Sequence, residues 1–298
     1  MKFEFTKYRK FFYGVSLFFA CASLLAIFIL GITPGIEFVG GSVLEVEYEK
    51  ERPSLSEINK SLSELNLGEF NIQSLGVSGY LIRTGSSDEE MHRNIMSALV
   101  GAEEKQFESI GPTVGEELKN MSFFAILIAS FLIIIYIAIS FKEEDGSVSS
   151  AKYGVIATGI AFLHDVLIVL GIFAVLGHFY GVQVTIPIAV ALLTTLGYSI
   201  NDTVVIFDRI RENLRKNRSG RDSLEKIVNN SLNETLGRSL GTSVTTLFVL
   251  FTLLFLTGAT LYYFVLALIL GIIIGTYSSI FLAGSLVLDW NSLTKRDK

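Results

Sequence analysis

Six long apolar stretches constrain this chain more than any other feature of its sequence. They cover residues 11–31, 122–141, 153–176, 184–207, 239–256 and 261–288. Each is close to the roughly 20 apolar residues that a helix needs to cross about 30 Å of hydrocarbon. Only 18% of the residues are charged, against about a quarter in soluble domains. We therefore expect an integral membrane protein with six transmembrane helices and exclude a soluble single-domain enzyme.

The basic residues predict how the chain crosses the membrane. Seventeen of the 24 lysines and arginines lie in the N-terminal residues, in 142–152, in 208–238 and at the C-terminus, whereas the other seven lie between residues 32 and 121 beside 16 acidic residues. Cytoplasmic flanks of membrane helices carry the excess of basic residues. We expect a cell-membrane protein with both termini in the cytoplasm. The first stretch lacks a small-x-small cleavage site, so it is predicted to be a retained helix rather than a signal peptide.

The polar segment 32–120 is predicted to be a separate α+β domain outside the cytoplasm. Alternating apolar residues predict strands at 43–48, 70–75, 80–84 and 105–110, and helical spacing predicts helices at 54–65 and 87–100. This βαββαβ order is typical of a ferredoxin-like sandwich. Residues 1–31 then form the cytoplasmic N-terminus and first helix, and residues 121–298 form the other five helices.

Three charged residues lie in or beside the apolar stretches, where ionised groups are costly and usually functional. Asp165 is near the middle of the third stretch, Asp202 is in the inner half of the fourth, and Arg238 precedes the fifth. Small and polar residues share helical stripes with them: Gly154, Thr158 and Ala161 with Asp165; Thr195, Tyr198 and Ser199 with Asp202; and Thr242 with Arg238. The pattern predicts three polar faces that meet in one interior.

The helical rise predicts how deep the acids lie. At 1.5 Å per residue, Asp202 is about 9 Å and Asp165 about 18 Å from the inner boundary, so the two carboxyl groups form a ladder. Burial favours a neutral acid and an approaching arginine favours the carboxylate. A helix movement that changes the distance between Asp202 and Arg238 would therefore act as a proton-coupled switch. His164, one residue from Asp165, is expected to point away and pack against neighbouring helices.

Other interpretations stay open at this point. Asp165 and Asp202 could only hold helices together, at roughly 1 kcal/mol per contact. They could form the dyad of an intramembrane aspartyl protease, although their different depths and the absence of a GxGD sequence argue against it. A proton-driven exporter of small molecules or lipids usually needs larger outer domains. The repeat Gly271, Gly275 and Ser279 fits either internal packing or a partner interface.

Cofactors and nucleic acid are not expected. The single cysteine, Cys21, cannot form a disulfide within the chain or a cysteine-based zinc site. No nucleotide-binding loop or metal-ligand cluster is found in the sequence of the outer domain. A net charge of −5 argues against a nucleic-acid partner, because phosphate binding requires a concentrated basic face. The partners predicted by composition alone are membrane lipids.

Five motifs resemble the SecF branch of the SecD/SecF family of protein-export membrane proteins, within the resistance-nodulation-division superfamily. They are GIEFVGG (35–41), IGPTVGEEL (110–118), LHDVLIVLG (163–171), LGYSINDTVVIFDRIREN (196–213) and LNETLGRSLGTSVTTL (232–247). The resemblance implies a subunit that uses the proton-motive force with SecD to drive late-stage translocation of preproteins through the SecYEG channel, with YajC as a further partner. It also implies that Asp202, Arg238 and Asp165 are proton-pathway residues. Glu37 departs from the aspartate more usual in the first motif.

Overall fold

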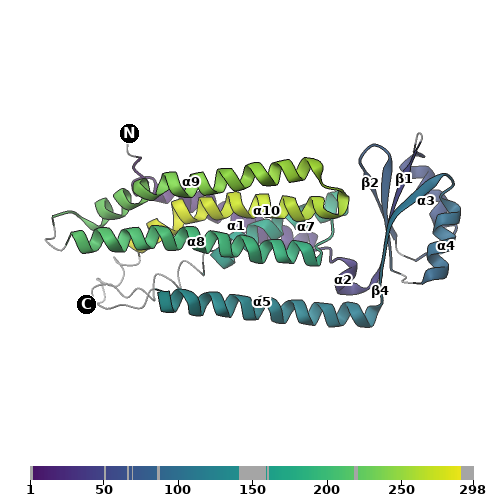
Figure 1. The fold of residues 1–298 in the computed structure, drawn as a ribbon, viewed down its shortest axis with the longest axis horizontal. Coiled ribbons are helices and arrows are strands. Elements are labelled where there is room, and N and C mark those ends of the chain that lie inside the picture. Colours follow the sequence, from purple (N-terminus) through teal and green to yellow (C-terminus); the bar gives the residue numbers. More distant parts are fainter. Residues whose placement is uncertain are drawn as a thin grey trace. The chain divides into compact units, whose positions relative to one another are not determined.

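The computed structural model describes residues 3–49, 52–65, 67–68, 70–85, 88–140, 159, 161–217 and 221–289. The chain divides into two compact units. The first comprises Met1–Ile29, Ile126–Ile172 and Pro187–Lys298, and the second comprises Leu30–Ala125 and Phe173–Ile186. Helices form the first unit, and the second contains a four-stranded sheet (Figure 1).

Long helices account for the apolar stretches. They are α1 (Arg9–Leu30), α5 (Pro112–Ser140), α7 (Leu167–Tyr180), α8 (Ile186–Lys216), α9 (Leu224–Leu256) and α10 (Ala259–Tyr277). Two π-helical turns, η1 (Ala161–Val166) and η2 (Ser278–Ala283), adjoin α7 and α10. Five described segments are long and apolar enough to cross a membrane: Arg9–Leu30, Leu163–Tyr180, Ile186–Lys216, Leu224–Leu256 and Leu261–Asp289. The remaining predicted stretch, 122–141, falls on α5 as far as Ser140, and residues 153–158 of the third stretch lie outside the described residues.

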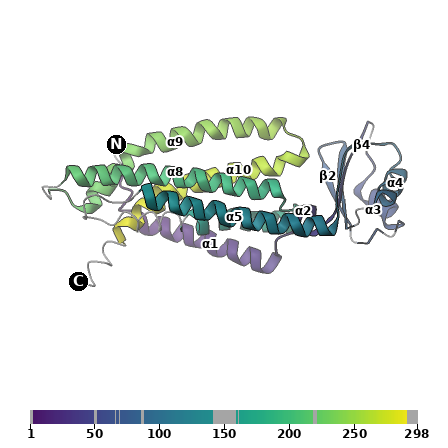
Figure 2. The ribbon, with the colours of Figure 1, turned by 60° about the horizontal axis from the view of Figure 1, so that its bottom comes forward.

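The basic segment 208–238 continues the membrane helices instead of forming a separate element along the membrane surface. Helix α8 runs to Lys216, and α9 already begins at Leu224, so Arg238 lies inside α9 rather than at its start. The Ser223 hydroxyl caps α9 by accepting a hydrogen bond from the Lys226 amide. A capped start and hydrogen bonds to the neighbouring helix allow a helix to continue from apolar into polar sequence. Figures 1 and 2 show α8, α9 and α10 side by side.

The sheet of the second unit has the predicted order of elements. It contains β1 (Gly41–Tyr48), β2 (Phe70–Leu75), β3 (Gly79–Thr84) and β4 (Ala102–Ile110), with α3 (Leu55–Ser63) after β1 and α4 (Glu89–Ala98) after β3. The strand order is β2-β3-β1-β4, and all neighbouring strands are antiparallel. Both helices cover the same face (Figures 1 and 2). Every predicted strand and helix of this segment is thus present within a few residues of its expected position.

A small apolar core joins these helices to the sheet. Val46 and Ile82 from the two central strands, Leu62 from α3 and Ile95 from α4 are buried together. Each such side chain stabilises the fold by roughly 1.5–3 kcal/mol when fully buried. A Ser54–Glu57 capping box starts α3. Alternation in the strand sequences reflects the face that packs against α3 and α4, although every residue of β3 is buried.

A short helix that the sequence did not predict, α2 (Ile36–Val39), connects α1 to the sheet. It is followed by two glycines with left-handed backbone, Gly40 at φ 80° and Gly41 at φ 124°. A Cβ atom on Gly41 would lie 2.4 Å from the carbonyl oxygen of Thr84 on β3. Glycine is required there by both the backbone angle and the close approach of the next strand.

Replacing Gly41 with alanine is expected to destabilise the second unit by roughly 1–3 kcal/mol, because the residue combines strained backbone with a steric clash. Thermal unfolding of the purified chain in detergent measures the effect. Gly85→Ala is the matched control, since nothing lies within 4 Å of a Cβ atom there and its backbone is not left-handed. Equal stability of the two variants would contradict this account of the GG sequence.

Glu37 of α2 is a partly buried acid outside the membrane-spanning segments. Its Oε2 atom is buried and makes no hydrogen bond within the described part of the chain. Burial raises the pKa of this carboxyl above its usual value, and the nearby Glu108 carboxylate adds to the effect. The backbone amides of Glu37 and Ile186 and the charge of Arg83 oppose it. The folded protein therefore holds the Glu37 proton to higher pH than the unfolded chain does.

This shift predicts a pH dependence of stability. An acid with a raised pKa in the folded state favours folding at low pH, and that contribution is lost as the pH rises from the ordinary glutamate value through the raised value. The thermal midpoint of Glu37→Gln relative to the parent chain should therefore increase with pH. Scanning calorimetry of both proteins in the same detergent checks it, and a constant difference across the pH series would refute the burial of this carboxyl as the cause.

Candidate functional site

The Asp165 carboxylate lies in a polar centre built from three helices. It is 4% exposed. Its Oδ2 accepts hydrogen bonds from Ser199 Oγ of α8 at 2.6 Å and from Ser278 Oγ of η2 at 2.9 Å. Its Oδ1 lies 2.8 Å from His164 Nδ1. Asp165 therefore ties the third predicted span to the fourth and sixth, and the sequence did not show that η2 contributes.

The prediction that His164 points away from Asp165 is wrong. The two residues share the π-helical turn η1, and their side chains are hydrogen-bonded. A π-helix closes its backbone hydrogen bonds over five residues instead of four, so that neighbouring side chains diverge less than in an α-helix. The sequence contains no signal for this extra residue in the turn. The imidazole also stacks against the Tyr277 ring, with centroids 6.5 Å apart.

Asp202 is the second buried acid of the bundle, 5% exposed on the inner face of α8. Its Oδ2 atom and the Oγ atom of Ser239 on α9 are both buried, and neither makes a hydrogen bond among the described residues. Ser239 provides the hydroxyl group beside the Asp202 carboxyl, and Arg238 is its neighbouring positive charge. Buried polar atoms normally have partners, so α8 and α9 meet here around an acid whose hydrogen bonding is incomplete among the described residues.

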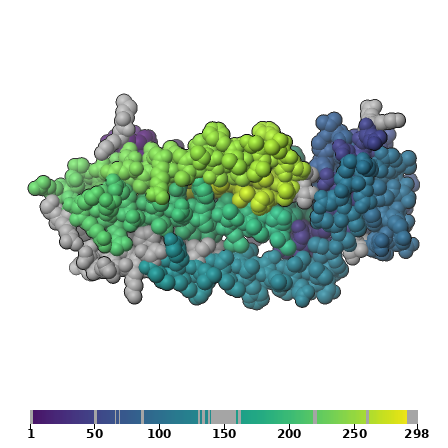
Figure 3. Space-filling model, viewed as in Figure 1, coloured from purple at the N-terminus to yellow at the C-terminus, as the bar shows by residue number. Residues whose placement is uncertain are grey.

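The predicted polar face of the fifth span is reversed. Arg238 and Thr242 lie on the exposed side of α9, and the Thr242 hydroxyl donates to the carbonyl of Arg238 at 3.1 Å. The buried stripe of α9 consists instead of hydroxyl residues four positions apart: Ser231, Thr235, Ser239 and Ser243. Figure 3 shows the outer surface of α9 along the bundle. Arg238 therefore lies outside the buried stripe of α9, although Ser239, the next residue, is part of it.

The three predicted supporting residues on α8 differ in what they do. Ser199 bonds Asp165, as described above. The Tyr198 hydroxyl donates to Ser243 Oγ at 3.3 Å, and Ser243 in turn lies 2.6 Å from Thr276 Oγ1 of α10. Thr195 is buried but donates to its own backbone, at the carbonyl of Leu192. Tyr198 thus enters a hydroxyl network that continues from α8 through α9 to α10, whereas Ser199 belongs to the Asp165 centre.

The small residues of α10 pack against α8 within this chain. A Cβ atom on Gly271 would lie 2.5 Å from Thr195 Cγ2, and one on Gly275 would lie 2.8 Å from Ser199 Cβ. The repeat continues to Ser279, whose hydroxyl donates to the carbonyl of Ser199 at 2.9 Å. Internal packing accounts for the GIIIG sequence, which brings α10 close enough for η2 to reach Asp165.

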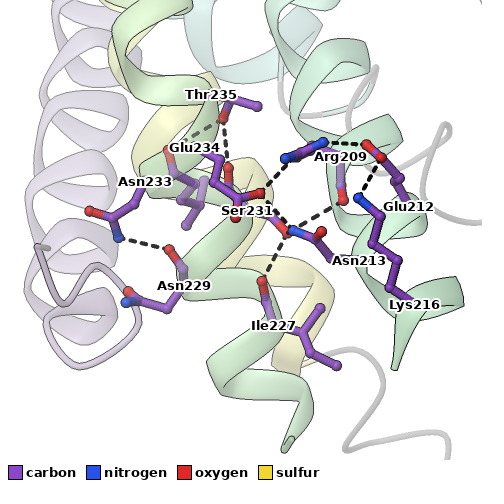
Figure 4. Close-up of polar contacts among 11 residues, drawn as sticks. Arg209, Glu212, Asn213, Lys216, Ile227, Asn229, Ser231, Asn233, Glu234 and Thr235 are labelled. Atoms are coloured by element: carbon purple, nitrogen blue, oxygen red, sulfur yellow. Dashed lines mark hydrogen bonds and ion pairs between the residues drawn. The ribbon is translucent and has the colours of Figure 1, made fainter. Parts of the chain in front are cut away.

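A polar clamp joins α8 to α9 beyond Asp202 (Figure 4). Arg209 donates through Nε to Glu234 Oε2 at 2.6 Å, and Asn213 Nδ2 donates to the same oxygen at 2.9 Å. Asn213 Nδ2 also lies 3.0 Å from Ser231 Oγ. Arg209 is seven residues after Asp202 and Glu234 is four before Arg238, which places the clamp about two helical turns from the acid. It holds the register of the two helices that carry Asp202 and Arg238.

The two acids do not form a catalytic dyad in this structure. The hydrogen-bond partners of Asp165 are His164, Ser199 and Ser278, and none is Asp202. Ser199 is one turn before Asp202 on α8, so the carboxyl groups differ in depth by about 4.5 Å, roughly half of the predicted offset. No group of three or more metal-ligating side chains occurs within the described ranges.

Comparisons with known proteins match almost the whole chain. The family described as "Protein export membrane protein SecD/SecF, C-terminal" matches residues 91–293, and the SecD/SecF GG motif matches residues 25–51. The chain is 39% identical to the protein translocase subunit SecF of Thermobaculum terrenum, covering 97% of this chain and 94% of that protein. It is 35% identical to SecF of Vibrio alginolyticus, covering 95% and 88%. The chain belongs to the SecD/SecF family.

A solved structure supports the same family. The crystal structure of SecDF, a translocon-associated membrane protein from Thermus thermophilus, aligns with a TM-score of 0.85 and 33% identity over 98% of this chain. The chain spans 39% of that protein's length. The SecD/SecF GG motif includes Glu37, Gly40 and Gly41, so the strained glycines described above belong to a family motif.

Gly271→Ala is expected to lower the free energy of unfolding by roughly 1–3 kcal/mol, the usual range for overpacking a filled interface. The added methyl group pushes α10 away from Thr195 and weakens the contacts of Ser278 with Asp165. Thermal unfolding in detergent measures the change. Gly197→Ala on α8, where a Cβ atom meets nothing within 4 Å, is the control and should be neutral. A stable Gly271→Ala protein would contradict the close α8–α10 packing.

Proposed function

We propose that this chain is a SecF subunit of the protein-export machinery. It works with SecD, uses the proton-motive force, and drives late-stage translocation of preproteins through SecYEG, with YajC as a further partner. The observation that carries the proposal is Asp202, a buried acid beside a serine and an arginine of α9, whose Oδ2 has no hydrogen-bond partner among the residues that the structure describes. An acid in this position changes its charge when the neighbouring helix moves.

The energy available fits a conformational step. One charge that crosses 100 mV supplies about 2.3 kcal/mol, which can shift the populations of two helix arrangements by roughly 50-fold. Protonation of Asp202 removes its attraction to Arg238, and α8 and α9 are then free to change their separation at this level. The Arg209–Glu234 clamp at the far end of the same helix pair provides a fixed point for such a movement.

The exposed face of α9 that carries Arg238 is suited to contact with a second chain. Gly237 and Gly241 on this face have nothing within 4 Å of an added Cβ atom, so another helix can approach closely. Arg238 and Thr242 lie on the same exposed side. We assign this surface to SecD, which would place an acid of its own opposite Arg238.

The membrane arrangement follows the same proposal. Helix α5 supplies the sixth span at 122–141, residues 32–120 form a ferredoxin-like domain outside the cytoplasm, and both termini lie in the cytoplasm. The strand order β2-β3-β1-β4 supports the ferredoxin-like assignment. The distribution of lysine and arginine supports the orientation. The outer domain would contact emerging polypeptide because it stands on the side to which preproteins are exported.

The two alternative functions are less well supported. An aspartyl protease requires two carboxyl groups that share a proton, whereas Asp165 is bonded to His164, Ser199 and Ser278. An exporter of small molecules or lipids requires an outer substrate cavity, and the four-stranded domain buries only a small core. Neither alternative accounts for relatives that are protein translocase subunits.

Asp202→Asn is expected to leave the chain folded and bound to SecD but to abolish proton-driven export. Preprotein uptake by vesicles that contain SecYEG, SecD and the variant, with and without a proton gradient, measures this. Asp208→Asn is the matched control, because Asp208 lies on the same helix and is exposed. Gradient-dependent export that survives Asp202→Asn would refute the proposal. Arg238→Ala should cause the same loss of activity.

A further inference from the structure

His164 and Asp165 form a paired acid and base in the bundle interior. Their side chains are 10% and 6% exposed, and His164 Nδ1 lies 2.8 Å from Asp165 Oδ1. Two serine hydroxyls occupy the other carboxylate oxygen, Ser199 at 2.6 Å and Ser278 at 2.9 Å. Both serines donate to Oδ2. When Asp165 is ionised, its Oδ1 accepts from the imidazole, and the ring hydrogen is then on Nδ1.

The second ring nitrogen of His164 is buried without a partner. No hydrogen bond to Nε2 is formed among the described residues. Leaving a buried polar atom unpaired costs about 1–3 kcal/mol, so such an atom in a well-packed interior calls for a reason. In the Nδ1–H tautomer, Nε2 carries a lone pair and is the site at which a neutral imidazole takes up a proton.

The described groups that face the pair are an aromatic ring and neutral hydroxyls. The Tyr277 ring stacks on the imidazole, and its hydroxyl is bonded to the Phe12 carbonyl at 3.0 Å and to Ser16 of α1 at 3.3 Å. From α8 and η2 the facing groups are the neutral hydroxyls of Ser199 and Ser278. Within the described residues, no lysine, arginine or further acid makes an ion pair with either member.

Hydroxyl groups connect the pair to the level of Asp202. Ser199 bonds Asp165, and its own carbonyl accepts from Thr203 at 3.1 Å and from Ser279 at 2.9 Å. Thr203 and Ser279 bond each other at 2.9 Å. Ser199 and Thr203 flank Asp202 along the buried side of α8. The His164–Asp165 pair and Asp202 therefore lie at neighbouring levels of one polar stripe.

Both π-helical turns lie at this site. Turn η1 carries His164 and Asp165, and turn η2 carries Ser278 and Ser279. A π turn replaces the favourable backbone geometry of an α-helix and is frequent at functional sites. Here the two turns bring all four polar side chains into one centre. A purely packing role would be met by regular helices with apolar residues at these positions.

We propose that His164 is a proton-carrying residue, paired with Asp165 as a second proton station in addition to Asp202. A proton that arrives at Nε2 converts the ring to imidazolium, and the Nδ1 proton then passes to Asp165 Oδ1, which leaves a neutral acid and a neutral imidazole. Release runs the same steps in reverse. The inference rests on the proposed proton-coupled function and adds a residue to it.

The first test measures proton-driven export with the full chain in vesicles that contain SecD and SecYEG. His164→Asn keeps an amide N–H near the Nδ1 position but cannot take up a proton. Proton-driven export should fall roughly a hundredfold or more, the range for loss of one positioned proton-transfer group, and its pH dependence should change. His178→Asn is the control, because His178 is exposed on α7. Unchanged export and an unchanged pH profile in His164→Asn would overturn the proposal.

The same vesicles separate this inference from the function on which it rests. If Asp202→Asn is inactive while His164→Asn behaves like the parent chain, the second station is refuted and the proposed function stands. If Asp202→Asn retains gradient-dependent export, the proposed function itself fails.

A second measurement does not depend on His164 variants folding. The chain has 3 histidines, so His92→Asn combined with His178→Asn leaves His164 as its only one. Nitrogen-15 NMR of histidine-labelled protein, reconstituted with unlabelled SecD, reports the protonation of both ring nitrogens. A titration between about pH 5 and pH 9 that moves when Asp165→Asn is added is the expected result. A ring that keeps one neutral tautomer throughout would refute the proposal.

Discussion

Every polar group inside this helical bundle must find its partner within the protein, because hydrocarbon offers none. That constraint explains the arrangement of the interior. The hydroxyls of α8, α9 and α10 bond one another or their own backbone, and small residues let the helices approach closely enough to do so. Gly271 and Gly275 against Thr195 and Ser199 are the clearest case. Among the described residues of the bundle, the buried side-chain atoms without a partner belong to His164, Asp202, Ser239 and Ser285.

The carboxyl groups of Asp165 and Asp202 differ in how far their hydrogen-bonding capacity is satisfied. Asp165 has a partner on three elements and could be only a structural tie, an interpretation that its serine contacts support. Its bond to His164 changes that view, because the second ring nitrogen of that histidine has no partner within the described part of the chain. Asp202 lies beside Arg238, and its Oδ2 makes no hydrogen bond to any residue that the structure describes. Asp165 is thus held by hydrogen bonds from its surroundings and is paired with a base. Asp202 is held in place by the alignment of α8 with α9.

The segments beyond the apolar stretches determine that alignment. Helices α8 and α9 continue past the acid and are joined by Arg209, Asn213 and Glu234. Surface ion pairs contribute little individually, at roughly 0–1 kcal/mol, but a network of three side chains fixes which residues of the two helices face each other. In the second unit, the GG sequence after α1 fixes how the chain enters the sheet.

The sequence by itself determined the elements: the apolar stretches, the βαββαβ order and the two acids were all predictable. Such features depend on local periodicity, where every residue of one face meets the same environment. The tertiary structure decided which face of α9 points inward. That helix has two polar stripes, one through Ser239 and one through Arg238, and periodicity cannot choose between them because the choice depends on which helix packs alongside. The same reason hid the His164–Asp165 pair, since a π-helical turn changes side-chain direction without any signature in the sequence.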